Sequence, residues 1–152
     1  MPVRWTIDHS ARLIVATAED VLCSEDIENY LDGVAAAATL SYRKLFDMTH
    51  CWPALREEDM PALGARIRNH EARGRMGEVV IVAVSDEAYQ QARLFEALVV
   101  ADRPLKIVRD TRAAYAWLSR GQEERDHRRG EKAVYSAKSE QESMAGLQRV
   151  EN

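Results

Sequence analysis

The stretch "EVVIVAVS", residues 78–85, is almost continuous in apolar residues, most of them β-branched. Such a run is typical of a central strand that is buried on both faces, as in a parallel sheet. It leads directly into "SDEAYQQARLFEALVVA", residues 85–101, where Ser85 or Asp86 can cap a helix. A buried strand that runs into a capped helix predicts a fold of the α/β class.

The segments that follow repeat this alternation. "RPLKIVRD", residues 103–110, has the pattern of a short strand, and a proline near its beginning is tolerated there. "DTRAAYAWLSRG", residues 110–121, predicts a helix that Asp110 caps and that Gly121 ends. A second strand-and-helix unit therefore follows the first.

The segments that precede it do the same. "YRKLFDMT", residues 42–49, predicts a strand that ends near Asp47. After a short loop, residues 55–76 carry apolar side chains near helical spacing, and we expect that helix to begin close to Asp59, with Pro61 in its first turn. The alternation thus extends over three strand-and-helix units.

The N-terminal part differs, because it begins with a pair of strands. Residues 3–20 contain two short alternating runs with a plausible turn between them, which predicts a β-hairpin. Residues 23–39 predict a helix capped by Ser24. The predicted order is ββαβαβαβα: a mixed β-sheet with a leading hairpin and parallel strands, and helices packed on it, over residues 1–120.

Residues 121–152 differ from the rest in composition. Charged residues are dense there and large apolar residues are few. We therefore expect a charged C-terminal tail, extended or helical, that lies outside the core. A tail of this kind gains order from a partner, which makes a homodimer plausible.

Length and charge exclude several classes of protein. The chain has 152 residues, 46% of them hydrophobic, and a net charge of -4, without a basic stripe. These features predict no nucleic-acid partner. No apolar run approaches the roughly 20 residues that span a bilayer, and the first residues do not resemble a secretory signal. Two cysteines without a CxxC motif indicate reduced thiols, and so a cytoplasmic protein that does not span a membrane.

The order and texture of these elements resemble the SpoIIAA-like group of the STAS superfamily, whose description overlaps with that of SEC14-like domains. The resemblance covers about residues 3–119. It depends on "LFDMT" (45–49), on "VVIVAVSD" (79–86) and on "KIVRDTRAAYAWL" (106–118), whose last unit contains Ala114, Trp117 and Leu118.

This resemblance implies a regulatory switch in a loop. Relatives that regulate sigma factors are phosphorylated by a partner kinase on a serine at the start of the helix after the middle strand. Asp47-Met48-Thr49 matches the first part of their motif, but residues 54–59 contain no hydroxyl group. We therefore expect a binding module without the phosphoserine switch of the family.

The loop after the strand predicted at residues 42–49 supplies most of the candidate site residues. Loops at the carboxyl ends of parallel strands are where α/β sheets bind ligands. Trp52 in this loop could line a crevice for a small apolar or lipid ligand, or it could pack at the sheet edge or in a dimer contact. The candidate ligand- or partner-binding residues are Asp47, Thr49, His50, Cys51, Trp52, Ser85 and Asp86.

Chemical roles for these residues have plain structural alternatives. Cys51 before a helix could be an activated thiol, or a small loop residue. His50 and Asp47 could form an acid–base pair, and Thr49 could accept a phosphate or bond its own backbone. Ser85 and Asp86 could simply cap the next helix. The histidines are scattered and no glycine-rich phosphate loop is present, so we expect no metal, no cofactor and no catalytic residue.

The sequence therefore favours a non-enzymatic binding module that acts through a protein partner or through self-association. One alternative is a small-molecule or lipid-binding protein that uses a crevice near Trp52. A second alternative is a thiol enzyme based on Cys51.

Overall fold

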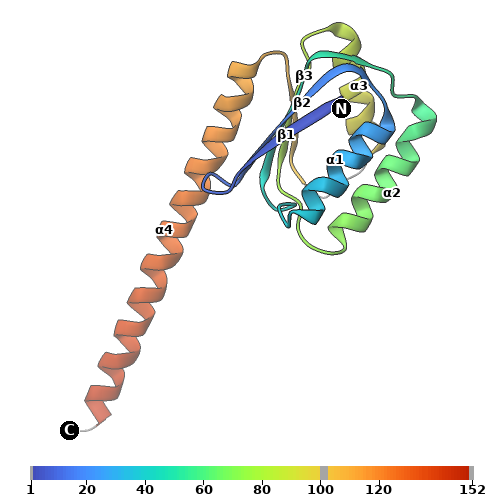
Figure 1. Cartoon of the computed structure of the whole chain (residues 1–152). Coiled ribbons are helices and arrows are strands. Elements are labelled where there is room, and N and C mark those ends of the chain that lie inside the picture. Colours follow the sequence, from blue (N-terminus) through green and yellow to red (C-terminus); the bar gives the residue numbers. More distant parts are fainter. Residues whose placement is uncertain (1, 100–102, 151–152) are drawn as a thin grey trace. The chain divides into compact units, whose positions relative to one another are not determined.

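The structure is a computed structural model that describes residues 2–99 and 103–150, with side chains as far as residue 145. It divides into two compact units, Met1–Tyr115 and Ala116–Asn152. The first unit contains the sheet, three helices and the beginning of a fourth helix. The second unit consists of the rest of that fourth helix (Figure 1).

The first unit is built on a five-stranded mixed sheet in which the strands follow one another in chain order. The first two strands form an antiparallel hairpin, and each later strand is parallel to its neighbour. The predicted mixed sheet with a leading hairpin is therefore confirmed. The strands are β1 (Val3–Asp8), β2 (Leu13–Leu22), β3 (Arg43–Pro53), β4 (Val79–Val82) and β5 (Leu105–Val108).

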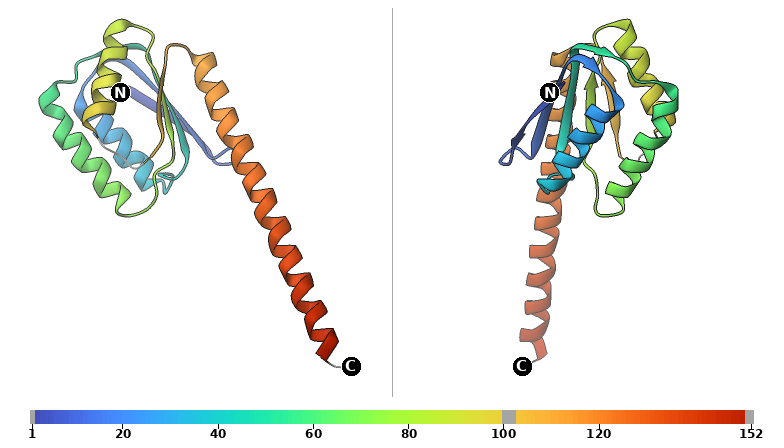
Figure 2. Two further views of the ribbon diagram at one scale, coloured as in Figure 1. Left: turned by 180° about the vertical axis from the view of Figure 1, so that it is seen from behind. Right: turned by 45° about the vertical axis from the view of Figure 1, so that its right-hand side comes forward.

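Three helices of the first unit cover one face of this sheet (Figure 2). The parallel strands are adjacent in chain order, and right-handed crossovers that all advance in one direction place their helices on the same side. The helices are α1 (Ser24–Ala36), α2 (Met60–Glu71) and α3 (Asp86–Leu98), and a short 3-10 turn, η1 (Glu57–Asp59), leads into α2.

The helix starts follow the expected capping chemistry with one shift. The Ser85 hydroxyl accepts a hydrogen bond of 3.1 Å from the Ala88 amide at the start of α3. Helix α1 begins one residue earlier than predicted, because Cys23 rather than Ser24 is its N-cap residue. The Asp26 carboxylate accepts a hydrogen bond of 2.8 Å from the Cys23 amide, so the acid in the first turn fixes the start of the helix.

The hydrophobic core lies between the sheet and these three helices. The Tyr30 ring of α1 is central to it, since it stands edge-on to Trp5 of β1 and tilted against Phe46 of β3, with ring centroids 5.5 Å apart in both pairs. Other buried side chains of this core include Ile14, Leu22, Leu31, Val34, Leu63, Ile67 and Ile81.

Strand β3 is longer than the sequence predicted. The segment that we expected to be a loop after Asp47 is the second half of the strand, and it pairs with β2 from Glu19↔His50 to Leu22↔Pro53. Strand β2 continues past an irregularity between Thr17 and Glu19, so its backbone can pair with β3 as far as Leu22. Cross-strand pairing therefore decides the conformation of a segment whose own sequence favours a loop.

Helix α4 (Thr111–Val150) is also longer than predicted. It begins as expected, because the Asp110 carboxylate accepts a hydrogen bond of 2.8 Å from the Ala113 amide. It does not end at Gly121. A single glycine costs a helix only about 1 kcal/mol, and the residues that follow are rich in Glu, Arg, Lys, Gln and Ala, which favour helix. Among residues 2–99 and 103–150, no helix combines the length and apolar character that crossing a bilayer requires.

Candidate functional site

A cavity of about 60 Å³ lies in the first unit between the sheet and the helices that cover it. Its wall is mostly apolar and comes from every layer of the unit: residues of α1, α3, β3 and β4 all contribute. Protein cores are packed as tightly as organic crystals and contain few voids larger than a water molecule, so this cavity is a candidate binding site. Apolar side chains of its wall include Ile27, Leu31, Phe46, Met48, Ile81 and Phe95.

Four polar side chains also line this apolar cavity: Tyr30, Lys44, Gln91 and Arg103. Tyr30 and Lys44 are almost completely buried, with 3% and 1% of their surface exposed. Lys44 stands in β3 on the same face as Phe46 and Met48, so a charged side chain occupies a position of the inward-facing stripe. Buried charges are rare unless they have a specific partner, which marks this group as the candidate site.

The turn before β3 provides backbone hydrogen-bond acceptors for the Lys44 side chain. Lys44 Nζ donates hydrogen bonds to the backbone carbonyls of Leu40, at 2.5 Å, and of Tyr42, at 2.8 Å. Burial, and then the nearby charge of Arg103, lower the pKa of Lys44 to about 7. A neutral amine has two N–H groups, which the two carbonyls satisfy. The ammonium form has a third N–H to offer.

Gly77 holds this turn in place. Its amide donates a hydrogen bond of 2.9 Å to the Leu40 carbonyl, the same oxygen that accepts from Lys44. A β-carbon at this position would lie 2.2 Å from the Tyr42 carbonyl oxygen, closer than any contact between real atoms of these types. The chain therefore needs a glycine here so that the backbone can approach the turn that binds Lys44.

Several polar atoms of the site have no hydrogen-bond partner among the described residues. They are the Tyr30 hydroxyl, Gln91 Oε1, and Nε and Nη1 of Arg103. Burial raises the pKa of Tyr30, and the charge of Arg103 opposes that rise. Burial lowers the pKa of Arg103, and the charges of Tyr30 and Glu71 oppose that fall. Buried polar atoms are nearly always bonded to protein, water or ligand, so these atoms are candidates to bond a water molecule or a ligand.

The charged groups of the site lie toward the amino ends of the parallel strands. Lys44 pairs with Val79, the first residue of β4, and Val79 pairs with Leu105, the first residue of β5. Arg103 precedes Leu105 by two residues. The sequence predicted a ligand site at the carboxyl ends of these strands, which is the opposite end of the sheet.

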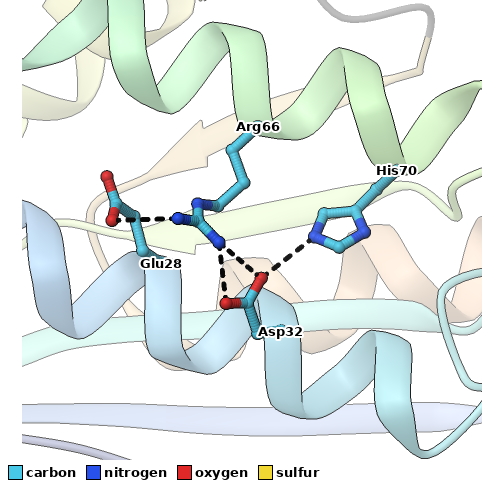
Figure 3. Close-up of polar contacts among 4 residues, drawn as sticks. All are labelled: Glu28, Asp32, Arg66 and His70. Atoms are coloured by element: carbon cyan, nitrogen blue, oxygen red, sulfur yellow. Dashed lines mark hydrogen bonds and ion pairs between the residues drawn. The ribbon is translucent and has the colours of Figure 1, made fainter.

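A polar cluster joins α1 to α2, two of the helices that cover this face of the sheet (Figure 3). Arg66 Nη1 of α2 donates two hydrogen bonds to the Asp32 carboxylate of α1, at 2.7 and 2.9 Å, and Arg66 also lies 3.4 Å from Glu28. His70 Nε2 lies 3.3 Å from the same Asp32 carboxylate. These contacts hold the two helices together beside the cavity.

Comparison with known proteins defines the fold. No protein-family model matches the chain. No curated protein matches it in sequence. Among solved structures, it is similar to an uncharacterized protein of the DUF3478 family with a SpoIIAA-like fold from Shewanella loihica PV-4. The two share 21% identity and a TM-score of 0.52 over 76% of this chain and 93% of that one. The chain has a SpoIIAA-like fold. The resemblance inferred from its sequence is confirmed at this level.

In this SpoIIAA-like fold, Asp47 and Thr49 bond to one another within β3, where its pairing with β2 shifts register. The Thr49 amide donates a hydrogen bond of 2.9 Å to Asp47 Oδ1, and the Thr49 hydroxyl donates to the same oxygen. Two residues of β3, Met48 and Thr49, lie opposite the single residue Ala18 of β2, which is the arrangement of a β-bulge. The structure thus gives these two residues a structural partner in each other.

The middle of the predicted site faces away from the cavity. His50 is exposed and Trp52 is 64% exposed, and neither residue lines the cavity. Cys51 is half-buried, with Sγ 3.5 Å from the Met48 carbonyl. Burial, and then the charge of Asp47, raise the pKa of Cys51 to about 11, which disfavours the reactive thiolate.

Ser85 and Asp86 belong to a separate network at the start of α3. Ser85 caps the helix, and the Asp86 carboxylate accepts a bond of 2.8 Å from Arg109. Arg109 also donates to the Val84 carbonyl at 2.9 Å and stacks over the Tyr89 ring, 4.7 Å from its centroid. These contacts tie the C-terminal side of β5 to α3.

Sequence reasoning missed Tyr30, Lys44, Gln91 and Arg103. One signal was available, since Lys44 alternates with Phe46 and Met48 and so falls on the buried stripe of its strand. Tyr30 matched the apolar face of α1 and gave no sign of a polar role. Gln91 and Arg103 have no local pattern that distinguishes them from surface residues. Among the described residues, no three His, Cys, Asp or Glu side chains gather as metal ligands.

Proposed function

We propose that this chain is a binding module that holds a small molecule with an apolar part in the cavity between its sheet and helices α1–α3. The observation that carries the proposal is the cavity itself, an apolar space inside an otherwise packed core. A site for one water molecule needs roughly 10–15 Å³, and this cavity measures about 60 Å³. It suits an organic molecule of a few non-hydrogen atoms.

The proposal moves the small-molecule alternative away from Trp52. Trp52 is exposed in the C-terminal half of β3 and does not line the cavity. Phe46 and Met48, which precede it in the same strand, do line the cavity. Binding rather than thiol chemistry is favoured because the raised pKa of Cys51 leaves little thiolate at neutral pH.

Titration of three four-carbon compounds, butanol, butanamide and butanoate, followed by ligand-observed NMR, tests this function. At least one of them should bind the wild-type chain. Ala92 lines the cavity and is buried in α3, so Ala92→Leu should fill the space and abolish binding. Trp52→Ala is the matched control and should leave binding unchanged. Binding that survives Ala92→Leu but is lost in Trp52→Ala would place the ligand near Trp52, at the carboxyl ends of the strands, and would contradict the proposal.

A second candidate function, self-association with another copy of this chain, is favoured by the surface of α4. Val134 and Met144 are 69% and 68% exposed. Together with Ala137 they follow a spacing of three and seven residues, which places them on one side of a helix. A long helix with an apolar stripe is stabilised by pairing with a partner helix.

Light scattering of the full chain during size-exclusion chromatography tests this second function. The wild-type chain should elute with the mass of a dimer, and Val134→Ser with Met144→Ser should shift it to the monomer. Ser143→Ala, an exposed change on the same helix, should not. A wild-type monomer at high concentration would contradict self-association and leave the cavity proposal untouched.

A further inference from the structure

We propose that the ligand of this cavity carries a carboxylate, and that Arg103, Lys44 and Tyr30 bind it near the amino ends of the parallel strands. This inference rests on the proposed small-molecule function and names the chemical class of the ligand.

The unpaired atoms of the site are mainly hydrogen-bond donors. The Tyr30 hydroxyl and two guanidinium nitrogens of Arg103, Nε and Nη1, have no partner among the described residues. Lys44 in its ammonium form adds a third N–H beyond the two that bind Leu40 and Tyr42. Gln91 presents an amide, which can turn to offer its NH₂. A carboxylate accepts several hydrogen bonds and donates none, so it complements this set.

The charges of the site agree with an anionic ligand. Lys44 and Arg103 both line the cavity, and each carries the cost of burial. Glu71 is the acid whose charge acts on Arg103. An anion between the two cations would offset their mutual repulsion and part of their lost hydration.

Arg103 also connects the cavity to the outside. It lines both the inner cavity and an outer hollow whose wall includes the exposed Arg73 and Arg75. A basic hollow concentrates anions at its mouth. The apolar part of the ligand then lies among Phe46, Met48 and Phe95, while its carboxylate remains with Arg103.

The decisive experiment compares butanoate with butanamide, which have the same number of non-hydrogen atoms. Wild-type protein should bind butanoate about tenfold or more tightly, since a charge-assisted bond exceeds a neutral one by more than a kcal/mol. Equal affinity for the two would overturn this inference and leave the proposed function standing. Binding of neither compound, nor of butanol, would overturn both, and would mean that ordered water satisfies the polar atoms.

Two variants and one control variant locate the carboxylate. Arg103→Gln should weaken butanoate about tenfold and leave butanamide unchanged. Tyr30→Phe removes only the hydroxyl and keeps the ring packing, and it should also weaken the binding of butanoate. It provides the test if Arg103→Gln does not fold. Arg93→Gln, an exposed change in α3, is the matched control. Unchanged preference for butanoate in both Arg103→Gln and Tyr30→Phe would overturn the assignment.

The pH dependence of binding gives an independent readout. As the pH rises from 7 to 9, Lys44 loses its proton, and butanoate, which stays ionised, should bind more weakly. Lys44→Met should bind butanoate more weakly at pH 7 and remove this decline. Tyr30, Arg103 and Glu71 are the other ionisable groups near the site, and the comparison with Lys44→Met separates the effect of Lys44 from theirs. A decline that persists in Lys44→Met would contradict the role of Lys44.

Discussion

Lys44 and Arg103 are two cations that line one apolar cavity, and after burial it is the charge of Arg103 that lowers the pKa of Lys44. Like charges in a core cost stability, and natural cores avoid them unless they serve a purpose. Here the cost is reduced by the carbonyls of the turn before β3, which bind the Lys44 amine. The same two buried charges therefore lower the stability of the fold and provide the cations of the proposed site.

The pH dependence of stability should reveal Lys44. The pKa is about 7 in the folded chain, against 10.5 for an ordinary lysine. Between these values the unfolded state binds more protons than the folded state, so the free energy of unfolding should rise with pH. The slope from this group reaches at most about 1.4 kcal/mol per pH unit and should vanish below pH 7, where both states are protonated. Urea unfolding at pH 6 to 10 measures it.

Comparison with variants isolates the contribution of Lys44, because other groups also titrate in this range. Lys44→Met should remove the rise with pH. Lys106→Met is the matched control, since it removes one lysine charge from an exposed position of β5. A rise that is the same in the wild type and in Lys44→Met would contradict the lowered pKa.

Gly77 should tolerate no side chain. A β-carbon there meets the Tyr42 carbonyl oxygen at 2.2 Å, and this oxygen belongs to backbone that cannot easily move. Gly77→Ala should lower the free energy of unfolding by about 2 kcal/mol, the typical cost of overpacking. Gly74→Ala is the matched control, because nothing lies within 4 Å of its β-carbon position. Denaturant midpoints of the two variants measure the difference, and equal midpoints would contradict the close approach.

The fold could be predicted from the sequence because its signals are local and repeated. The buried run of residues 79–82 and the caps Ser85 and Asp110 each follow from side chains next to one another in the chain. The hairpin at the start follows from alternation in residues 3–20. Strand order then follows because strands that are consecutive in the chain tend to be neighbours in the sheet.

The site could not be predicted because its members meet only in three dimensions. Tyr30, Lys44, Gln91 and Arg103 come from four different segments, and each has an ordinary role when considered alone. The expected loop at residues 49–53 misled for the same reason: its pairing with β2 depends on how far β2 continues. Local sequence cannot supply that information.

The contact between Arg66 and Asp32 should stabilise the pairing of α1 with α2. Arg66 Nη1 makes two hydrogen bonds to one carboxylate on the neighbouring helix, so the pair should exceed an ion pair with a single contact. A double-mutant cycle with Arg66→Ala and Asp32→Ala should give a coupling energy of about 1 kcal/mol.

Arg93 and Glu96 of α3 provide the matched control for that cycle. They form one contact of 3.3 Å at positions i and i+3 of a single exposed helix turn, and their coupling energy should be about 0.3 kcal/mol. Equal coupling in the two pairs would show that Arg66 and Asp32 contribute no more than a solvated ion pair.

Cys51 should react slowly with alkylating reagents. Its pKa is raised from 9.0 to about 11, first by burial and then by the charge of Asp47. At pH 8 its thiolate fraction is then about a hundredfold smaller than that of an ordinary thiol, and the rate of alkylation follows the thiolate. Iodoacetamide labelling of Cys23→Ser, which leaves Cys51 as the remaining thiol, should therefore be much slower than labelling of Cys51→Ser, which leaves the exposed Cys23. Asp47→Asn should speed the labelling of Cys51 by removing the negative charge. A Cys51 that reacts faster than Cys23 would instead support the thiol enzyme.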